Sequence, residues 1–479
     1  MEKRPRSFVG STVAEFDGVD LGDARRVARL KKVVARLAAA PSSGFPRALV
    51  DESDLEGFYR LLRNEDVSFE SLLSPHTHAT VNRTAGLAEV LAVHDSSEFH
   101  FAGKRKGLGV LKKKGHGFIG HFTLAVTADG SRAPLGMLAT EIWARTKPSM
   151  SALCRAGKIT YRKMRVLPNE QDRWLRGVAA SEAAIGNDGC RLIHVMDSEA
   201  DDYDIMTTLL QDRRRWVIRL CQDRALAELG STARRYAKEF VAKCKVVCTR
   251  RVHLSRRGRT PAFQRKRQRP RPEREALLDI SATPLTFKRP QYGTGQPSIS
   301  VNVVCARERS APKGEEPVEW ILITTEPIKT RAQILKVIDI YRTRWVIEEF
   351  FKALKTGCAF EKRQLESWHT LRNALGIFVP IAWQLLHLRT VARQEGTAPA
   401  RAVLTPIQET VLRRASKTKL PRKLTTQNAM LAVAALGGHL RSNGEPGWLV
   451  LGRGLQDLLM LVAGYQLATE KRGKDAINH

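Results

Sequence analysis

The chain of 479 residues is long enough for about three domains with an ample core, and its 43% hydrophobic content excludes an intrinsically disordered protein. Its 80 Lys and Arg residues outnumber 49 Asp and Glu residues, which gives a formal net charge of +31. That charge exceeds what solubility requires and predicts a polyanionic partner.

The basic residues are clustered in three stretches, 104–114, 250–274 and 413–423. Several separate basic patches predict a long nucleic-acid path over the surface. A chain that binds a membrane would more often concentrate its charge beside an apolar helix.

The sequence also indicates a reducing compartment. Its seven cysteines form no C-x-x-C pair and show no zinc-ligand spacing. The first residues carry no apolar segment of signal length, and no uninterrupted apolar run approaches about 18 residues. We therefore expect a cytoplasmic, chromosome-associated protein with no membrane partner.

Residues 1–75 are predicted to form a helical N-terminal DNA-binding domain. Three helices are expected, the first capped by Asp23 and ending near residue 40, the second running from Ser53 to Arg63, and the third capped by Ser68. Arg25 and Arg26 belong to the basic face of the first helix. Three short helices with a basic face fit a DNA-reading module, although any three-helix bundle with solvated cations looks much the same.

From about residue 85 the pattern becomes that of a mixed α/β sheet. Strands are expected at 90–94, 121–127, 135–140, 191–196 and 216–220, with a helix at 167–185 and a hairpin signal at Asp129-Gly130. Asp95 and Asp197 each directly follow a buried strand. A lone aspartate at a strand end is usually a turn former or a helix cap. Two of them favour ligand chemistry where the strand ends meet.

The regular pattern breaks at Cys221 and resumes near Trp320. The residues between hold the basic tract 250–274, the β-like piece 299–304 and prolines at 261, 270, 272, 284, 290 and 297. This composition predicts an inserted, mainly β subdomain at about 221–318, within a catalytic domain that covers 76–385.

Residues 386–479 are predicted to form a helical C-terminal dimerisation domain. One face of its last helix carries Leu455, Leu458, Leu459, Val462 and Tyr465. That face is a candidate dimer contact, and ordinary core packing within the same domain explains it equally well.

The stretch 340–355 is predicted to be one helix with a charged stripe. At about 100° per residue, Tyr341, Arg344, Glu348 and Lys355 project into a single sector roughly 60° wide. Such a stripe is a poor core face but suits the binding of phosphate oxygens beside a metal-binding carboxylate. Arg344 and Glu348 are also spaced as an i, i+4 ion pair, and most such pairs are solvated surface features.

Asp95, Asp197 and Glu348 are candidate ligands for magnesium. Mg²⁺ is a hard cation that binds carboxylate oxygens and keeps waters and phosphate oxygens as its remaining ligands. Two such ions, one on either side of a scissile phosphate, would activate the attacking oxygen and stabilise the leaving oxygen. No His or Cys ligand is needed for this chemistry.

The spacing of the charged stripe matches the Y-R-E-K signature of the cut-and-paste DDE transposases of the insertion-sequence-four group, and the chain most closely resembles the Tn-five transposase. Asp197-Ser198-Glu199-Ala200-Asp201 is similar to the group's second-aspartate motif, and His94-Asp95-Ser96-Ser97 stands where the first aspartate is expected. Residues 21–26 and 56–60 resemble its N-terminal end-binding domain. Further similarity at 403–406 and 436–438 extends the resemblance over nearly the whole chain.

The resemblance implies a ribonuclease-H-like mixed-sheet catalytic core with an inserted β subdomain, flanked by helical N- and C-terminal domains. It implies a homodimer in the synaptic complex, with double-stranded DNA, both transposon ends and target DNA, as partner. Members of the group nick the transposon end, form a hairpin, resolve it and join the freed 3′ hydroxyl to target DNA.

The resemblance also implies roles for individual residues. Two Mg²⁺ ions per active site, for which Mn²⁺ is expected to substitute, would be held by Asp95, Asp197 and Glu348. The DNA-binding residues would be Tyr341, Arg344 and Lys355 at the end phosphates, Trp320 at a base flipped out of the duplex, and Arg25 and Arg26 in the N-terminal domain. The chain departs from the pattern at Ser198, where the group commonly has Arg, and at Ser96-Ser97, where it has paired threonines.

Two other functions remain open from the sequence. A ribonuclease-H-like nuclease without strand transfer would explain the carboxylates but not the Tyr-Arg-Lys set. A catalytically silent DNA-binding inhibitor of a transposase would need none of the three acids, all of which are present.

Overall fold

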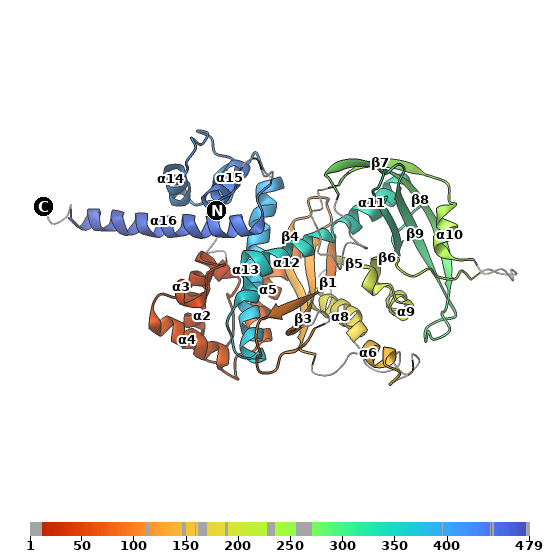
Figure 1. The fold of residues 1–479 in the computed structure, drawn as a ribbon, viewed down its shortest axis with the longest axis horizontal. Coiled ribbons are helices and arrows are strands. Elements are labelled where there is room, and N and C mark those ends of the chain that lie inside the picture. The colour runs from red at the N-terminus through yellow and green to blue at the C-terminus, as the bar shows by residue number, and fades with distance from the viewer. Residues whose placement is uncertain are drawn as a thin grey trace.

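A mixed β-sheet lies at the centre of the molecule, with helical regions at its N- and C-terminal sides (Figure 1). The computed structural model describes residues 12–111, 115–145, 150–158, 160, 170–186, 190–227, 235–254, 271–394, 396–440, 442 and 445–475. Most of the predicted basic tract 250–274, and part of 104–114, lie outside these described residues.

The N-terminal helices are α2 (Ala24–Ala39), α3 (Phe45–Ala48), α4 (Glu52–Arg63) and α5 (Phe69–Thr84). The predicted caps Asp23 and Ser68 are confirmed, because their side chains accept hydrogen bonds from the backbone N–H groups of Arg25 and Ser71. The second helix starts one residue earlier than expected, at Glu52, and Asp51 caps it. These helices bury their apolar faces in the largest hydrophobic core of the molecule.

The sheet contains β1 (Glu89–Phe101), β2 (Gly109–Val110), β3 (His116–Thr127), β4 (Pro134–Trp143), β5 (Arg191–Met196), β6 (Arg215–Arg219), β7 (Cys248–Leu254), β8 (Arg274–Lys288), β9 (Ser298–Glu308) and β10 (Glu319–Thr324). Its order is β2-β3-β1-β5-β6-β10-β9-β8-β7, with β4 paired to β3. β1, β5 and β6 are parallel, and the other pairings are antiparallel. The predicted hairpin between β3 and β4 is confirmed.

Helices cover both faces of the sheet. One face packs on α8 (Arg173–Ile185), α9 (Tyr203–Gln211) and α10 (Ala237–Ala242), and the other packs on α11 (Arg331–Arg342), α12 (Trp345–Lys352) and α13 (Trp368–Gln394). A further short helix, α6 (Met150–Arg155), lies at the periphery (Figure 1). Among the described residues α13 alone is long and apolar enough to cross a membrane, and 78% of its most apolar window is buried inside the protein. It is therefore built as a core helix.

The segment 221–318, predicted to be mainly β, contains the strands β7, β8 and β9. These strands do not stand apart from the sheet, because β9 pairs with β10 and thereby extends the central sheet. At the other predicted boundary, α13 runs without a break through residue 385. The limits of the three domains remain predictions.

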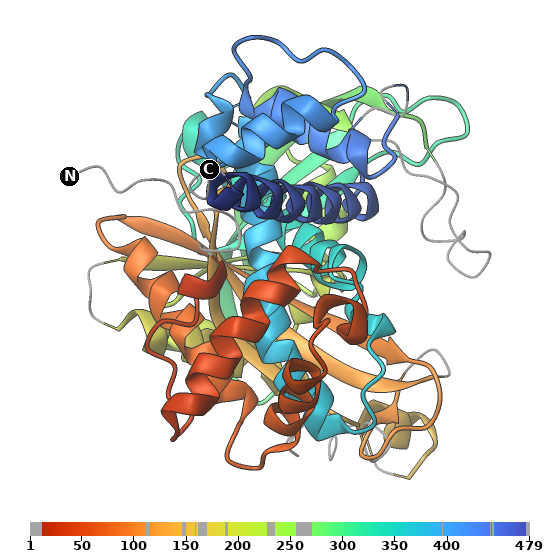
Figure 2. The same ribbon diagram turned by 90° about the vertical axis from the view of Figure 1, so that its left-hand side faces the viewer.

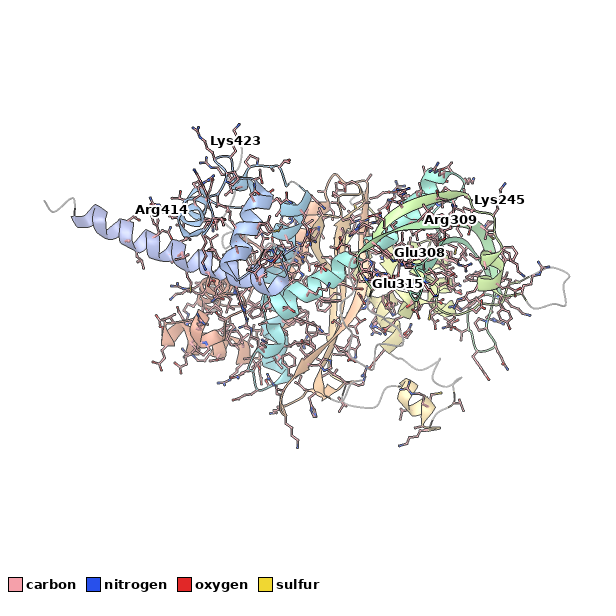
Figure 3. All side chains as sticks on the ribbon, turned by 45° about the horizontal axis from the view of Figure 1, so that its top comes forward. Lys245, Glu308, Arg309, Glu315, Arg414 and Lys423 are labelled. Atoms are coloured by element: carbon pink, nitrogen blue, oxygen red, sulfur yellow. The ribbon has the colours of Figure 1, made fainter. Side chains whose placement is uncertain are left out.

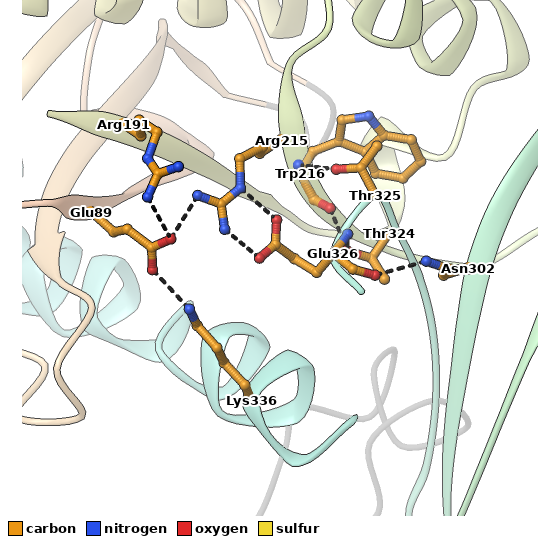
Figure 4. A network of polar contacts seen from close by, with 9 residues as sticks. All are labelled: Glu89, Arg191, Arg215, Trp216, Asn302, Thr324, Thr325, Glu326 and Lys336. Atoms are coloured by element: carbon orange, nitrogen blue, oxygen red, sulfur yellow. Dashed lines mark hydrogen bonds and ion pairs between the residues drawn. The ribbon is translucent and has the colours of Figure 1, made fainter. Parts of the chain in front are cut away.

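A network of ion pairs fixes α11 to the edge of the sheet where β1 and β5 begin (Figure 4). The Glu89 carboxylate lies 2.7 Å from Lys336 Nζ of α11 and 2.7 Å from Arg215 Nη1 of β6. Arg215 in turn pairs with Glu326 at 2.6 Å. These contacts hold α11 against the starts of the parallel strands. Its last turn extends toward their carboxyl ends, where the two aspartates lie.

The C-terminal helices are α14 (Pro406–Ala415), α15 (Thr426–Leu436) and α16 (Trp448–Asp475). α16 lies between α14–α15 and the N-terminal helices, and its last turns extend beyond them (Figures 1 and 2). Leu455, Leu458 and Val462 are buried within the chain's own core. These three are therefore unavailable as a dimer contact, and the alternative of core packing is correct for them.

Candidate active site

Asp95 and Asp197 lie at the same level on neighbouring parallel strands. The pairing of β1 with β5 ends where Val93 stands opposite Val195. Each aspartate follows two residues later, so the register brings the two side by side. The expectation that Asp95 ends its strand is wrong in one respect, because β1 continues to Phe101 in its pairing with β3.

Both aspartates are held by a backbone N–H group and are largely buried. Ser96 N donates to Asp95 Oδ1, and Glu199 N donates to Asp197 Oδ1, each at 2.8 Å. Burial raises the pKa of Asp95 to about 7 against the opposing effect of Arg344, and the neighbouring Asp197 and Glu348 raise it further. Burial also raises the pKa of Asp197. Burial is therefore the main reason that both carboxyl groups hold a proton more tightly than usual.

Arg344 connects two of the three candidate carboxylates. Its Nη1 donates to Asp95 Oδ2 at 3.0 Å, and its Nη2 donates to Glu348 Oε1 at 2.5 Å. The side chain of Arg344 is 11% exposed, so this ion pair is not the solvated surface pair that its i, i+4 spacing also suggested. Its Nε is buried and finds no acceptor within the described part of the chain.

The prediction of one helix over 340–355 is wrong. α11 ends at Arg342 and α12 begins at Trp345. In the junction, Val346 N and Ile347 N donate to carbonyls three residues back, which tightens the chain locally. Beyond α12 the chain widens into a π-helical turn, Ala353–Gly357. Arg344 still reaches Glu348 across this irregular stretch, whereas Lys355, on the π-helical turn, bonds to the backbone of β1.

Lys355 lies on the π-helical turn and points to β1. Its Nζ donates to the backbone carbonyl of Glu98, lies 4.8 Å from the centroid of the Phe99 ring, and lies 3.5 Å from Glu361 Oε1. The ammonium group therefore bonds to β1 three residues beyond Asp95, and these three contacts involve none of the three candidate carboxylates.

Tyr341 and Trp320 form an aromatic pair beside the aspartates. Their ring centroids are 6.4 Å apart at an interplanar angle of 59°. Tyr341 is 5% exposed, and burial raises the pKa of its phenol. Trp320 is partly buried and packs against the main core. The indole is therefore partly exposed and partly packed against the core.

Arg25 and Arg26 lie far along the chain from this cluster, at the start of α2. The Arg25 side chain is 92% exposed and pairs with Asp23 at 3.0 Å. Arg26 pairs with Asp66 at 3.0 Å and also donates to the carbonyl of Leu21. Arg25 is thus open to a partner, whereas Arg26 also holds the N-terminal helices together.

Arg173 is a site residue that the sequence reasoning missed. It begins α8 and is 7% exposed, and it donates to the side chains of Ser96 and Glu199, which flank the two aspartates. A signal was available, because residue 173 falls on the same helical stripe as the buried Gly177 and Ser181. A cation on a buried stripe calls for anionic or polar partners.

The donor set fits a hard divalent cation. Asp95, Asp197 and Glu348 offer carboxylate oxygens, which are preferred ligands of Mg²⁺. Among the described residues no three His, Cys, Asp or Glu side chains are already arranged as a ligand cluster. Arg344 neutralises two of the carboxylates in this arrangement.

The site and the N-terminal helices both fall in stretches that match known families. Residues 12–67 match the Transposase DNA-binding family, and this range contains Arg25 and Arg26. Residues 185–379 match the Transposase DDE domain family, which includes Asp197 and Glu348, whereas Asp95 precedes the matched range.

Among solved structures, the piggyBac transposase in a synaptic complex with hairpin DNA is similar, with 12% identity and a TM-score of 0.34 over 95% of this chain and 74% of that chain. A score this low gives no support to a shared mechanism. DDE transposase domains cleave and transfer phosphodiester bonds and generally use divalent metal ions. The two family matches show that this chain combines a transposase DNA-binding domain with a DDE transposase domain.

Proposed function

We propose that the chain is an active cut-and-paste transposase, which binds transposon ends, nicks them, forms and resolves a hairpin, and joins the 3′ ends to target DNA. The observation that carries this proposal is the convergence of three acids from distant parts of the chain. The β1–β5 register aligns Asp95 with Asp197, and Arg344 links Asp95 to Glu348.

Asp95, Asp197 and Glu348 would hold two Mg²⁺ ions, or Mn²⁺ in their place, and these ions would activate the attacking oxygen and stabilise the leaving oxygen. The chain's own residues position the DNA. Arg344 would contact a phosphate oxygen, for which a planar guanidinium is well suited. Lys355 and Tyr341 would contact neighbouring phosphates, and the indole of Trp320 would stack on an extruded base.

The strand order supports a ribonuclease-H-like core. Three antiparallel strands, β4, β3 and β1, continue into the parallel strands β5 and β6, with aspartates at the carboxyl ends of the parallel pairing. Assignment to the insertion-sequence-four group, closest to the Tn-five transposase, rests on the Y-R-E-K spacing and on the two aspartate segments.

A basic loop between α14 and α15 supports double-stranded DNA as the partner. The exposed cations of this loop are Lys417, Lys419, Arg422 and Lys423. Within the described part of the chain none of these four is in an ion pair, whereas Arg413 pairs with Glu409 and holds the loop through the carbonyls of Pro421 and Arg422. Arg414 and Lys423 project from the C-terminal region in Figure 3. Phosphate oxygens are the natural partner of such a surface.

The exposed side of α16 supports a homodimer. Met460, Leu461 and Leu467 are 54%, 46% and 64% exposed, although all three are apolar. A second copy of the chain would cover them. This face replaces Leu455, Leu458 and Val462 as the proposed contact.

The test is a cleavage and joining assay on a duplex that carries the inverted repeat bracketing the gene. With Mg²⁺ or Mn²⁺ we expect nicked, hairpin and joined products in that order. Cleavage without joining would favour a nuclease that lacks strand transfer. End binding without cleavage would favour a silent inhibitor of a transposase.

A further inference from the structure

We propose that Arg173 is a positioning residue that holds the two aspartate segments of the active site in register. The proposal rests on the proposed function, since it concerns how the candidate metal ligands are kept together. It assigns a role in the site to α8, a helix that carries none of the three candidate metal ligands.

Each of the three guanidinium nitrogens of Arg173 donates a hydrogen bond. Nε donates to Ser96 Oγ at 2.9 Å, Nη2 donates to Glu199 Oε2 at 2.7 Å, and Nη1 donates to the carbonyl of Glu170 at 2.7 Å. The side chain is 9% exposed. A buried guanidinium with a donor on each side of the site acts as a fixed spacer between β1 and the loop after β5.

Ser96 and Glu199 are the residues whose backbone N–H groups hold the aspartates. Ser96 N donates to Asp95 Oδ1, and Glu199 N donates to Asp197 Oδ1. Arg173 therefore grips, by their side chains, the two residues that orient the two carboxylates by their backbone. A shift of either contact moves the carboxylate that depends on it.

The chain offers no local substitute for this cation. Between residues 192 and 212, the stretch that contains Asp197, the sequence has no Lys or Arg, and Ser198 follows the aspartate directly. Arg173 brings a positive charge to this stretch from α8. Burial lowers the pKa of the Arg173 guanidinium, and the negative charges of Glu199, Glu170, Asp197 and Asp95 oppose that effect.

A simple structural role for Arg173 makes a different prediction. If the residue only attached α8 to the sheet, its loss would lower the unfolding temperature and reduce DNA binding and cleavage together. A positioning residue changes how the carboxylates bind a cation while the fold and end binding persist.

The experiment compares Arg173→Ala and Arg173→Lys with a matched control on the same helix. Arg176 lies three residues further along α8 and pairs with Glu141 at 2.8 Å, away from the aspartates. Mn²⁺ binding to the full chain is measured by electron paramagnetic resonance titration, beside a thermal melt and an end-binding gel shift. We expect Arg173→Ala to weaken Mn²⁺ binding by about 10- to 100-fold, as for other residues that orient metal ligands. Arg176→Ala should leave it unchanged.

Arg173→Lys should recover part of the loss, because an ammonium group can reach one partner but cannot span both. Glu199→Gln tests the same contact from the side of Glu199. The Glu199 side chain is 53% exposed, so the fold should tolerate this substitution more easily than the loss of Arg173. It should weaken Mn²⁺ binding in the same direction. If Arg173→Ala does not fold, Glu199→Gln decides.

Wild-type Mn²⁺ affinity in a folded Arg173→Ala variant, or in Glu199→Gln when Arg173→Ala does not fold, would overturn the proposal and leave the proposed function intact. A wild-type chain that binds no Mn²⁺ at all would overturn the metal site itself, and the positioning role with it.

Discussion

Arg344 Nη1 lies 3.0 Å from Asp95 Oδ2, although 249 residues separate the two in the sequence. The contact joins α12 to β1 at the point where β1 leaves its pairing with β5. It places a cation between carboxylates that would otherwise repel each other. The arrangement allows separate tests of the acids and of the guanidinium.

Replacement of Asp197 by Ala should abolish cleavage while end binding stays close to wild type. The reason is that Asp197 lies beside Asp95 in the candidate metal site, whereas the DNA-binding match covers residues 12–67. Cleavage of a labelled end duplex and a gel shift are measured in parallel. Asp212→Ala, at an exposed position after α9, serves as control. A loss of binding as large as the loss of cleavage would show that Asp197 is structural.

Arg344→Lys should impair cleavage and joining by about 100-fold, a magnitude typical of misplacing a reacting group by about 1 Å. The guanidinium reaches Asp95 and Glu348 at the same time, and an ammonium group cannot reproduce that planar geometry. The rate of hairpin formation under single-turnover conditions measures the effect. Wild-type rates would reduce Arg344 to an ion-pair partner of no catalytic consequence.

Glu89→Gln should destabilise the protein by up to about 1 kcal/mol at neutral pH, since its partners Lys336 and Arg215 are partly exposed and Arg215 keeps its pair with Glu326. Hydrogen bonds from Lys336 and Arg215 lower the pKa of Glu89 to about 2 from its ordinary 4.5. A carboxyl with a lowered pKa stabilises the fold above about pH 4.5 and loses that contribution as the pH falls toward 2.

The difference in unfolding temperature between wild type and Glu89→Gln should therefore be full at pH 7 and shrink below about pH 4.5. Thermal melts across this range provide the measurement. Glu65→Gln, at an exposed position between α4 and α5, should show no such trend. A pH-independent difference would mean that Glu89 acts through packing.

Neutralisation of Lys417, Lys419, Arg422 and Lys423 to Gln should weaken binding to DNA of any sequence. It should also reduce the slope of log K against log salt by up to about 0.9 for each lost phosphate contact. For a two-residue comparison, Arg422→Gln with Lys423→Gln is set against Lys243→Gln with Arg309→Gln. The control cations are already paired with Glu239 and Asp279. An equal salt slope in both double variants would show that the loop does not contact DNA.

Local patterns predicted the elements that carry the site. The strand before Asp197, the caps at Asp23 and Ser68 and the hairpin at Asp129 each follow from residue types within a few positions, and each is present. The pairing of Asp95 with Asp197 follows from two buried runs that both end in an acid. Short-range chemistry was sufficient for these features.

What the sequence did not reveal depends on long-range contacts. The break at Thr343 is the exception, since the hydrogen bond from its hydroxyl to the carbonyl of Asp339 and the tight turn that follows are both local. Leu455, Leu458 and Val462 would be apolar both in a dimer contact and in a core. They are buried because α15 packs against α16. Arg173 resembles a surface cation until Ser96 and Glu199 are brought to it by the fold.

Trp320→Ala separates a stacking role from a packing role. Trp320 lies 6.4 Å from Tyr341 between ring centroids and only partly fills the core. A partly exposed indole beside the carboxylates can stack on an extruded base, which offsets part of the few-kcal/mol cost of unstacking it.

If stacking is the role, the Trp320→Ala variant should keep its unfolding temperature, bind ends and make the first nick, and then accumulate nicked DNA with little hairpin. If packing is the role, loss of the aromatic should cost about 3–5 kcal/mol and depress every step together. Trp320→Phe keeps an aromatic face and should recover hairpin formation under the first alternative. Quantification of nicked, hairpin and double-strand-break products beside a thermal melt decides between them. A normal hairpin yield in folded Trp320→Ala would rule out stacking, because the step that needs an extruded base would then proceed without its platform.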